Sequence, residues 1–195
     1  MYYRKIVGER IYLSPVDPAD AAIYTRWMND PEVTLGLGNF DRVYTETSER
    51  TVLEDMAKDA KNLSFAIIEK AVDRVIGNCG LFALDATRRI ATIGIFIGES
   101  SYMSGGYGTE ALALLIDFGF RSLNLHNMNL FYFSYNARGE QAYRKLGFQE
   151  VGRRREAIRY HGKYYDEVMM DLLEEEFRQG PFADVVQLDL AGYEF

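Results

Sequence analysis

Short, strand-like runs of apolar residues dominate the first half of the chain. Runs rich in β-forming residues predict strands over 10–13, 62–69, 75–83 and up to residue 97, and stretches with one apolar face predict helices over 17–29 and 45–60. Short turns join the last three strands, which predicts an antiparallel meander. Gly36 and Gly38 lie within residues 35–44, which we expect to form a mobile connection.

The pattern changes after residue 97. A helix that is apolar on nearly all sides is predicted over 109–123, followed by a strand over 129–135 and a helix over 137–146 that stops at Gly147. Residues 148–160 and 164–173 indicate a closing hairpin with Gly162 in its turn. We therefore predict an α/β (α+β) fold with a mixed, mostly antiparallel sheet flanked by helices, in one domain over 1–177 with a tail over 178–195.

Composition and charge narrow the classes of function. The net charge of −7 and the pI of about 5.0 argue against binding to nucleic acid, because the phosphate backbone is bound by basic surfaces. Cys79 is the single cysteine and there are only two histidines, so we expect neither disulfides nor a metal site. The N-terminus lacks the apolar core of a signal peptide, and no apolar run is long enough to span a membrane, which predicts a cytoplasmic protein.

A glycine-rich loop follows the strand that ends at Ile97 and leads into the most apolar helix. Glycine lets main-chain N–H groups converge without interference from a Cβ atom, and a helix N-terminus adds partial positive charge at the same place. Together they form a cradle for a phosphate or diphosphate. The alternative is that the glycines only shape a tight turn between strand and helix. The segment consists of Met103, Ser104, Gly105, Gly106, Tyr107, Gly108 and Thr109.

The residues around the loop argue against two nucleotide-binding motifs. Gly106, Gly108 and Ala111 match the glycine spacing of a dinucleotide-binding fold, but the next predicted strand ends at residues 133–136 without the carboxylate that would hold the ribose. A nucleotide-hydrolysing P-loop requires Gly-Lys-Ser/Thr, whereas Thr109 and Glu110 follow the last glycine here.

Four features in order along residues 8–177 resemble the GNAT superfamily of acetyl-CoA-dependent N-acetyltransferases. They are the segment 24–33 around Trp27, the loop and helix start over 106–111, the segment 136–148, and the final hairpin. The resemblance is greatest to the branch of ribosomal-protein N-terminal and spermidine acetyltransferases, and it implies a GNAT-like fold. The motifs are specific together, although each alone is weak.

The resemblance implies a site for acetyl-CoA and no metal. Pantetheine would lie beside Ile95, Phe96 and Ile97, and the diphosphate would lie on the amides from Met103 to Thr109. Asn136 would fix the pantetheine or ribose region; its alternative role is to cap the helix that follows. The chain departs from the family at two positions, because Met103 stands where relatives often have Gln or Arg, and Gly105 stands where they often have Lys.

The resemblance also assigns catalytic roles. Tyr143 would be the general acid that protonates the leaving thiolate; the alternative is an aromatic residue that packs on Leu146. A strand N–H near Phe96 or Ile97 would hold the carbonyl oxygen, and Ser134 is a candidate contact for the amine.

Other polar and aromatic residues have less specific expectations. The general base is not assigned, because the spacing of Glu32, Glu69 and Asp166 selects none of these carboxylates. We expect Glu110 to complement the helix dipole. Tyr24 and Trp27 line the acceptor pocket or pack in the core. Acidic residues near the first helix indicate a cationic acceptor, or else only a solvated helix face; they are Asp17, Asp20, Asp30 and Glu32.

The sequence thus predicts transfer of acetyl from acetyl-CoA to a primary amine by direct attack. The acceptor could be a protein N-terminus, a polyamine or another small amine. Two alternatives are a non-catalytic coenzyme A-binding sensor and an interaction module. Apolar residues of the tail, among them Val185, Leu188 and Phe195, would pack on the domain or on a second subunit, so a homodimer or higher homo-oligomer is a possible assembly.

Overall fold

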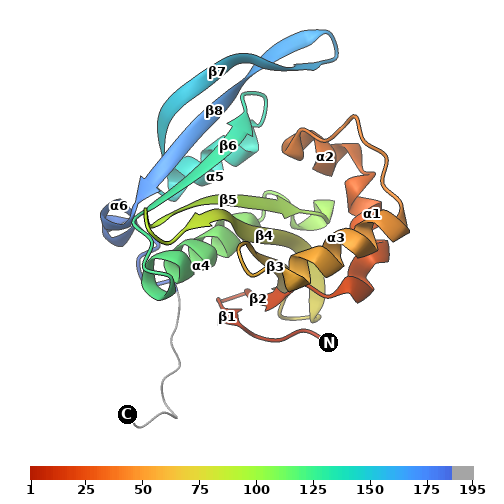
Figure 1. Ribbon diagram of the computed structural model, residues 1–195, viewed down its shortest axis with the longest axis horizontal. Helices are drawn as coiled ribbons and strands as arrows, with labels where there is room; N and C mark the ends of the chain where they lie inside the picture. Colours follow the sequence, from red (N-terminus) through yellow and green to blue (C-terminus); the bar gives the residue numbers. More distant parts are fainter. Residues whose placement is uncertain (186–195) are drawn as a thin grey trace.

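A computed structural model describes residues 1–185 of the chain. Its strands form one sheet in the order β1-β2-β3-β4-β5-β6-β8-β7 (Figure 1), in which all neighbours are antiparallel except β5 and β6. The mixed, mostly antiparallel sheet predicted from sequence is therefore confirmed. The strands are β1 (Ile6–Val7), β2 (Ile11–Pro15), β3 (Leu63–Glu69), β4 (Arg74–Asp85), β5 (Ile90–Ile97), β6 (Asn127–Phe133), β7 (Gln149–Tyr160) and β8 (Lys163–Leu173).

Helices cover both faces of the sheet (Figure 1). They are η1 (Pro18–Asp20), α1 (Ala21–Met28), α2 (Pro31–Leu37), α3 (Glu46–Lys58), η2 (Ser100–Tyr102), α4 (Tyr107–Ser122), α5 (Ala137–Lys145) and α6 (Glu174–Gln179). Alternate residues of a strand point to opposite faces, so each strand supplies two cores. In β2, Ile11 and Leu13 join the core under α4, whereas Tyr12 joins the core under α1, α2 and α3.

Two segments differ from the sequence-based expectation. The expected connection over 35–44 begins inside helix α2, which is capped by the Asp30 side chain, starts with Pro31 and ends at Gly38 in the left-handed conformation. Asp30 and Pro31 are a typical helix start and Gly38 is a typical helix stop, although two glycines so close together favour a loop. The expected helix over 17–29 is divided into η1 and α1, because Asp17 caps the first and Asp20 lies at the start of the second.

Strands β5 and β6 diverge along their length (Figure 1). Their parallel pairing joins only Ile90–Thr92 to Asn127–Asn129, although β5 stays paired with β4 as far as Ile97. Beyond residue 92, the β6-facing edge of β5 has no strand partner among the described residues. Directly after β5, Gly98 is buried against Trp27, where a Cβ atom would overlap the indole ring. The end of β5 is thus held against the core of α1 while β6 turns away with β8.

A buried carboxylate connects α4 to β2. The Glu110 carboxylate accepts hydrogen bonds from the Arg10 main-chain N–H (2.8 Å), from Arg10 Nε (2.9 Å) and from the Ile11 N–H (3.3 Å). Glu110 lies in the first turn of α4, where a negative charge also suits the helix dipole. Its main-chain partners nevertheless lie on another element, so its principal role is to join α4 to the start of β2.

We predict that Glu110→Gln lowers the free energy of unfolding by about 2 kcal/mol, because the glutamine carbonyl can keep both main-chain donors but its NH2 group then faces the Arg10 Nε–H, so the charged hydrogen bond to Arg10 is lost. Urea denaturation monitored by circular dichroism measures the change. Glu46→Gln is the matched control, since Glu46 pairs only with Arg50 on the exposed face of α3; this change should cost less than about 0.5 kcal/mol. Equal effects of the two substitutions would contradict the structural role of Glu110.

Candidate active site

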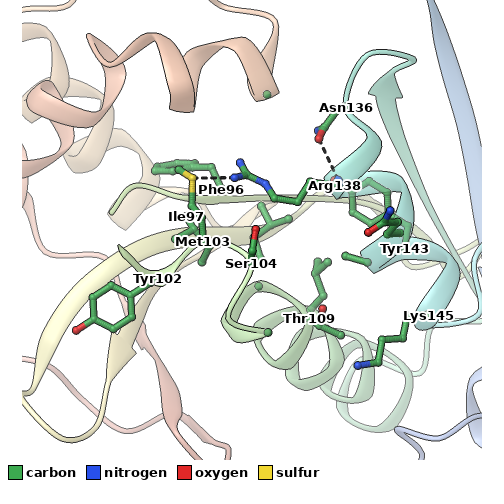
Figure 2. Close-up of a pocket in the computed structure, with 18 of the residues that line it drawn as sticks. Phe96, Ile97, Tyr102, Met103, Ser104, Thr109, Asn136, Arg138, Tyr143 and Lys145 are labelled. Atoms are coloured by element: carbon green, nitrogen blue, oxygen red, sulfur yellow. Dashed lines mark hydrogen bonds between the residues drawn. The ribbon is translucent and has the colours of Figure 1, made fainter. Parts of the chain in front are cut away.

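A cavity of about 370 Å³ lies where β5 and β6 diverge. Its walls come from α2, from the end of β5, from the loop between β5 and α4, and from α4 and α5 (Figure 2). The predicted site residues that line it are Ile95, Phe96, Ile97, Met103, Ser104, Gly106, Gly108, Thr109, Asn136 and Tyr143. The topology therefore brings together residues that are far apart in the sequence.

The loop takes a shape that places main-chain N–H groups at the cavity. Ser104 and Gly106 have positive φ angles of 60° and 84°, and Gly106 is the N-cap of α4 without a side-chain capping bond. The first N–H groups of a helix have no partner within the helix. Those of α4 belong to Tyr107, Gly108 and Thr109, at the start of a helix of 16 residues. The loop and helix start thus offer uncapped donors and the positive end of a helix dipole.

Two of the predicted loop residues lie outside this cavity. Gly105 accepts a hydrogen bond from Arg10 Nη1 through its carbonyl oxygen (2.9 Å). The Tyr107 ring packs beneath the Arg10 guanidinium, whose central carbon lies 4.4 Å from the ring centroid. Arg10 therefore fixes the outer side of the loop, while the residues on either side of Gly105 face the cavity.

Asn136 and Tyr143 come from opposite ends of α5. The Asn136 Oδ1 accepts a hydrogen bond from the Gly139 N–H (2.9 Å), so Asn136 caps α5, which was one of its two expected roles, and it also lines the cavity. Tyr143 lies across the cavity from Met103 and Ser104 (Figure 2). Burial raises the pKa of Tyr143 to about 12. Its hydroxyl makes no hydrogen bond within residues 1–185, which leaves it available to a ligand.

The cavity is lined by two cations that the sequence analysis did not select, Arg138 and Lys145 (Figure 2). They lie seven residues apart on α5 and therefore share one helix face. Arg138 Nη1 lies 2.9 Å from the Met103 sulfur and 3.9 Å from the Glu32 carboxylate, so it reaches across to the loop and to α2. The i, i+7 spacing of basic residues on a predicted helix was the signal that could have identified them. No carboxylate is among the residues that line this cavity.

Ser134 does not line the cavity. It is exposed at the end of β6, where its hydroxyl accepts a hydrogen bond from the Asp166 main-chain N–H (3.1 Å). The expected two-residue spacing from Asn136 does not bring it into the site, because the chain turns between Phe133 and Ala137.

Tyr24 and Trp27 belong to the core. Tyr24 is 3% exposed and its hydroxyl accepts a hydrogen bond from the Asn78 side chain (3.1 Å), while Trp27 is 1% exposed and donates from Nε1 to Glu99 (3.2 Å). Both rings contact Phe96 edge-on. They pack in the core against β5 and do not line the cavity. Core packing was the second of the two interpretations made from sequence.

Acidic side chains near the first helix serve the fold. Asp17 pairs with the N-terminal amine (3.4 Å), Asp20 accepts from the Tyr2 hydroxyl (2.9 Å), and Asp30 caps α2 through the Glu32 N–H (2.8 Å). Each of the three carboxylates thus has a partner within the fold, although Asp20 Oδ2 is buried without a hydrogen bond. They give no support to a cationic acceptor.

The remaining candidate bases also lie outside the cavity lining. Glu69 is buried and accepts from the Val72 N–H (3.0 Å), and Asp166 accepts from the Glu156 N–H (3.0 Å). Within residues 1–185, no group of three His, Cys, Asp or Glu side chains is placed to hold a metal ion. The helices of the same part of the chain are all too short or too polar to cross a membrane.

The sequence model described as an acetyltransferase (GNAT) domain matches residues 10–149. This match includes β5, the glycine loop, α4 and α5. The chain belongs to the GNAT family. An uncharacterized N-acetyltransferase, p20 of Bacillus licheniformis, is 30% identical over 171 residues, which cover 87% of this chain and 96% of that protein. This GNAT protein is accordingly an N-acetyltransferase, as the family resemblance predicted.

Solved structures confirm the fold. A GNAT-family acetyltransferase from Bacillus anthracis superposes with a TM-score of 0.76 at 22% identity and covers 90% of this chain and all of that one. Spermidine N-acetyltransferase from Vibrio cholerae, solved with coenzyme A and spermine, gives a TM-score of 0.77 at 21% identity and covers 86% of this chain and 98% of that one. At these identities the two structures show the GNAT fold alone.

Proposed function

We propose that this GNAT protein transfers acetyl from acetyl-CoA to a primary amine by direct attack in a ternary complex. The observation that carries the proposal is a single cavity with three matching walls. They are the unpaired edge of β5, the uncapped N-terminus of α4, and a half-buried tyrosine whose hydroxyl makes no hydrogen bond within residues 1–185. Coenzyme A has parts that fit each wall: an amide-containing pantetheine arm, a diphosphate and a sulfur.

The diphosphate lies on the loop amides from Met103 to Thr109. The loop itself contains no cation, because Met103 and Gly105 stand where relatives often carry polar or basic side chains. Arg138 supplies the missing charge from α5, since its guanidinium lies against the Met103 sulfur. A thioether is a weak acceptor, so this contact leaves the guanidinium donors available to an anion.

The pantetheine arm lies along β5 in the place of a missing strand. Its amides pair with main-chain groups of Ile95, Phe96 and Ile97, whose β6-facing edge has no strand partner among the described residues. Asn136 closes this channel from the side of α5. Polar main-chain groups at an open edge favour an extended, amide-containing ligand.

Acetyl-CoA supplies a thioester whose carbonyl carbon is attacked by the neutral amine nitrogen, so that a C–N bond forms, the C–S bond breaks and the thiolate leaves, while the proton that the amine loses passes to water. A main-chain N–H near Phe96 or Ile97 donates to the carbonyl oxygen. The Tyr143 hydroxyl donates to the developing thiolate. Because its pKa is raised to about 12, well above the roughly 8.5 of a thiol, full proton transfer is uphill. Tyr143 therefore acts mainly as a hydrogen-bond donor.

The acceptor belongs to the primary amines, among them protein N-termini, polyamines and other small amines. The resemblance to the ribosomal-protein and spermidine branch supports this range. A thiol-release assay with acetyl-CoA and a panel of peptides, polyamines and small amines tests the proposal directly. Binding of coenzyme A without thiol release with any amine would instead favour the non-catalytic sensor.

We predict that Gly106→Val weakens coenzyme A binding at least tenfold. Gly106 has φ of 84°, which a β-branched residue strongly disfavours, and a Cβ atom there lies 3.3 Å from Arg10 Nη2. Titration calorimetry with coenzyme A measures the effect. Gly162→Val is the control with the same strain, since Gly162 has φ of 79° and open space around it in the β7–β8 turn. Unchanged affinity for Gly106→Val would remove the loop from the cofactor site.

We predict that Tyr143→Phe lowers kcat about 100-fold with less than a threefold change in coenzyme A affinity, because only the hydroxyl contact to sulfur is lost. Tyr143 should stay protonated in the wild type up to about pH 11, so its ionisation should cause no fall in kcat between pH 8 and 10. Steady-state thiol release across this range measures both effects. Wild-type turnover by the phenylalanine variant would exclude the assigned role.

We predict that Arg138→Gln weakens coenzyme A binding about tenfold, since one charge-assisted contact to the diphosphate is lost. Arg144→Gln is the matched control on the same helix, because Arg144 pairs with Glu140 and lies outside the cavity. Calorimetry at two salt concentrations compares them. Equal affinities of the two variants would show that Arg138 makes no contact with the cofactor.

A further inference from the structure

A second cavity of about 610 Å³ lies beside the glycine loop. One wall is the loop with the start of α4, and the opposite wall is the segment Gly180–Val185, here called the C-terminal segment. Glu9, Arg10 and Lys145 complete the lining. The match to the family ends at residue 149, so the family's definition does not account for this wall.

The two cavities are neighbours. Gly106, Thr109 and Lys145 line both of them, so they meet at the N-terminus of α4. If the diphosphate of a ligand lay at this point, one arm of that ligand would extend into the first cavity. The other arm would extend into the second.

The C-terminal segment is packed on the domain. Phe182 and Val185 are partly buried against the core that lies under α4. Within the segment, the Val185 N–H donates to the Phe182 carbonyl (3.3 Å). The Lys145 ammonium lies 5.7 Å from the centroid of the Phe182 ring. The segment thus forms a defined wall with an aromatic side chain beside a cation.

The lining of this cavity combines two cations with three carboxylates, one of which, Glu110, is paired with Arg10. Lys145 makes no ion pair with any described residue. Arg10 is held by Glu110 and the Gly105 carbonyl through Nε and Nη1, and Nη2 makes no hydrogen bond within residues 1–185. Glu9 and Asp184 also line the cavity and can accept hydrogen bonds from amino or hydroxyl groups.

We infer that the second cavity binds the 3′-phosphoadenosine half of coenzyme A, with the C-terminal segment as part of the cofactor site. The adenine ring stacks on Phe182, and Lys145 leaves its position beside that ring to contact the 3′-phosphate. This inference rests on the proposed function, because the diphosphate on the glycine loop determines where the nucleotide half lies. It gives residues 180–185 a role in binding.

Calorimetry with three ligands tests the inference. The ligands are coenzyme A, dephospho-coenzyme A, which lacks the 3′-phosphate, and 4′-phosphopantetheine, which lacks the whole 3′-phosphoadenosine and keeps one of the two bridging phosphates. Phe182→Ala should weaken coenzyme A and dephospho-coenzyme A about tenfold each, because a stacking face is lost, and should leave 4′-phosphopantetheine unchanged. Lys145→Met should weaken coenzyme A about tenfold and dephospho-coenzyme A little.

Matched controls separate binding from folding. Phe131→Ala removes an exposed phenylalanine of β6 that lines neither cavity, and Lys163→Met removes an exposed lysine at the start of β8. Phe182→Leu keeps an apolar side chain for packing but removes the flat ring, and it should lose most of the same affinity. It therefore serves as the test if Phe182→Ala unfolds.

The outcomes are distinct. Wild-type affinity of Phe182→Leu for coenzyme A would overturn the stacking role, and an equal loss for all three ligands would show that Phe182 only supports the fold. Tighter binding after deletion of residues 180–195 would show that the C-terminal segment covers the cavity instead of binding in it. Failure of the wild type to bind coenzyme A would overturn the proposed function itself.

Discussion

The separation of β5 from β6 is the constraint on which the rest of the site depends. Two parallel strands that stayed paired would satisfy each other's main-chain groups and leave no space between them. Here the pairing stops after three residue pairs, since β6 follows β8 and β5 follows β4. The buried contact of Gly98 with Trp27 holds the far end of β5 in place. The cavity is therefore a product of sheet topology, and α4 and α5 only line it.

The aromatic residues that pack against β5 matter for the site as much as the residues that line the cavity. Tyr24 and Trp27 contact Phe96, which lines the cavity, in edge-to-face geometry. Both are almost fully buried and hydrogen-bonded, so they form a rigid backing for the strand edge. A strand edge that binds a flexible ligand needs such a backing, because a positional error of the donors weakens every contact together.

The sequence predicted those parts of the structure that rest on local signals. Turn glycines, caps and apolar periodicity located the meander, α4, α5 and the closing hairpin, and the paired motifs located the loop and Tyr143. Helix α2 was missed because Gly36 and Gly38 masked its Asp-Pro start. Arg138 and Lys145 were missed for a different reason: their role depends on which face of α5 meets the cavity, and only the tertiary arrangement determines that face. Ser134 lies outside the cavity although it is only two residues from Asn136, and its contact with the amine stays a prediction.

Arg10 has a consequence for the energetics of ligand capture. Its side chain contacts the glycine loop at the Gly105 carbonyl and the Tyr107 ring, and Glu110 of α4 holds this side chain in place. The loop is therefore preorganised by the N-terminal strand before any anion arrives. A preorganised cradle loses little conformational entropy on association, so most of the attraction between amides and phosphate is retained as affinity. The first dozen residues of the chain thus influence the affinity of a loop that lies about a hundred residues further along the sequence.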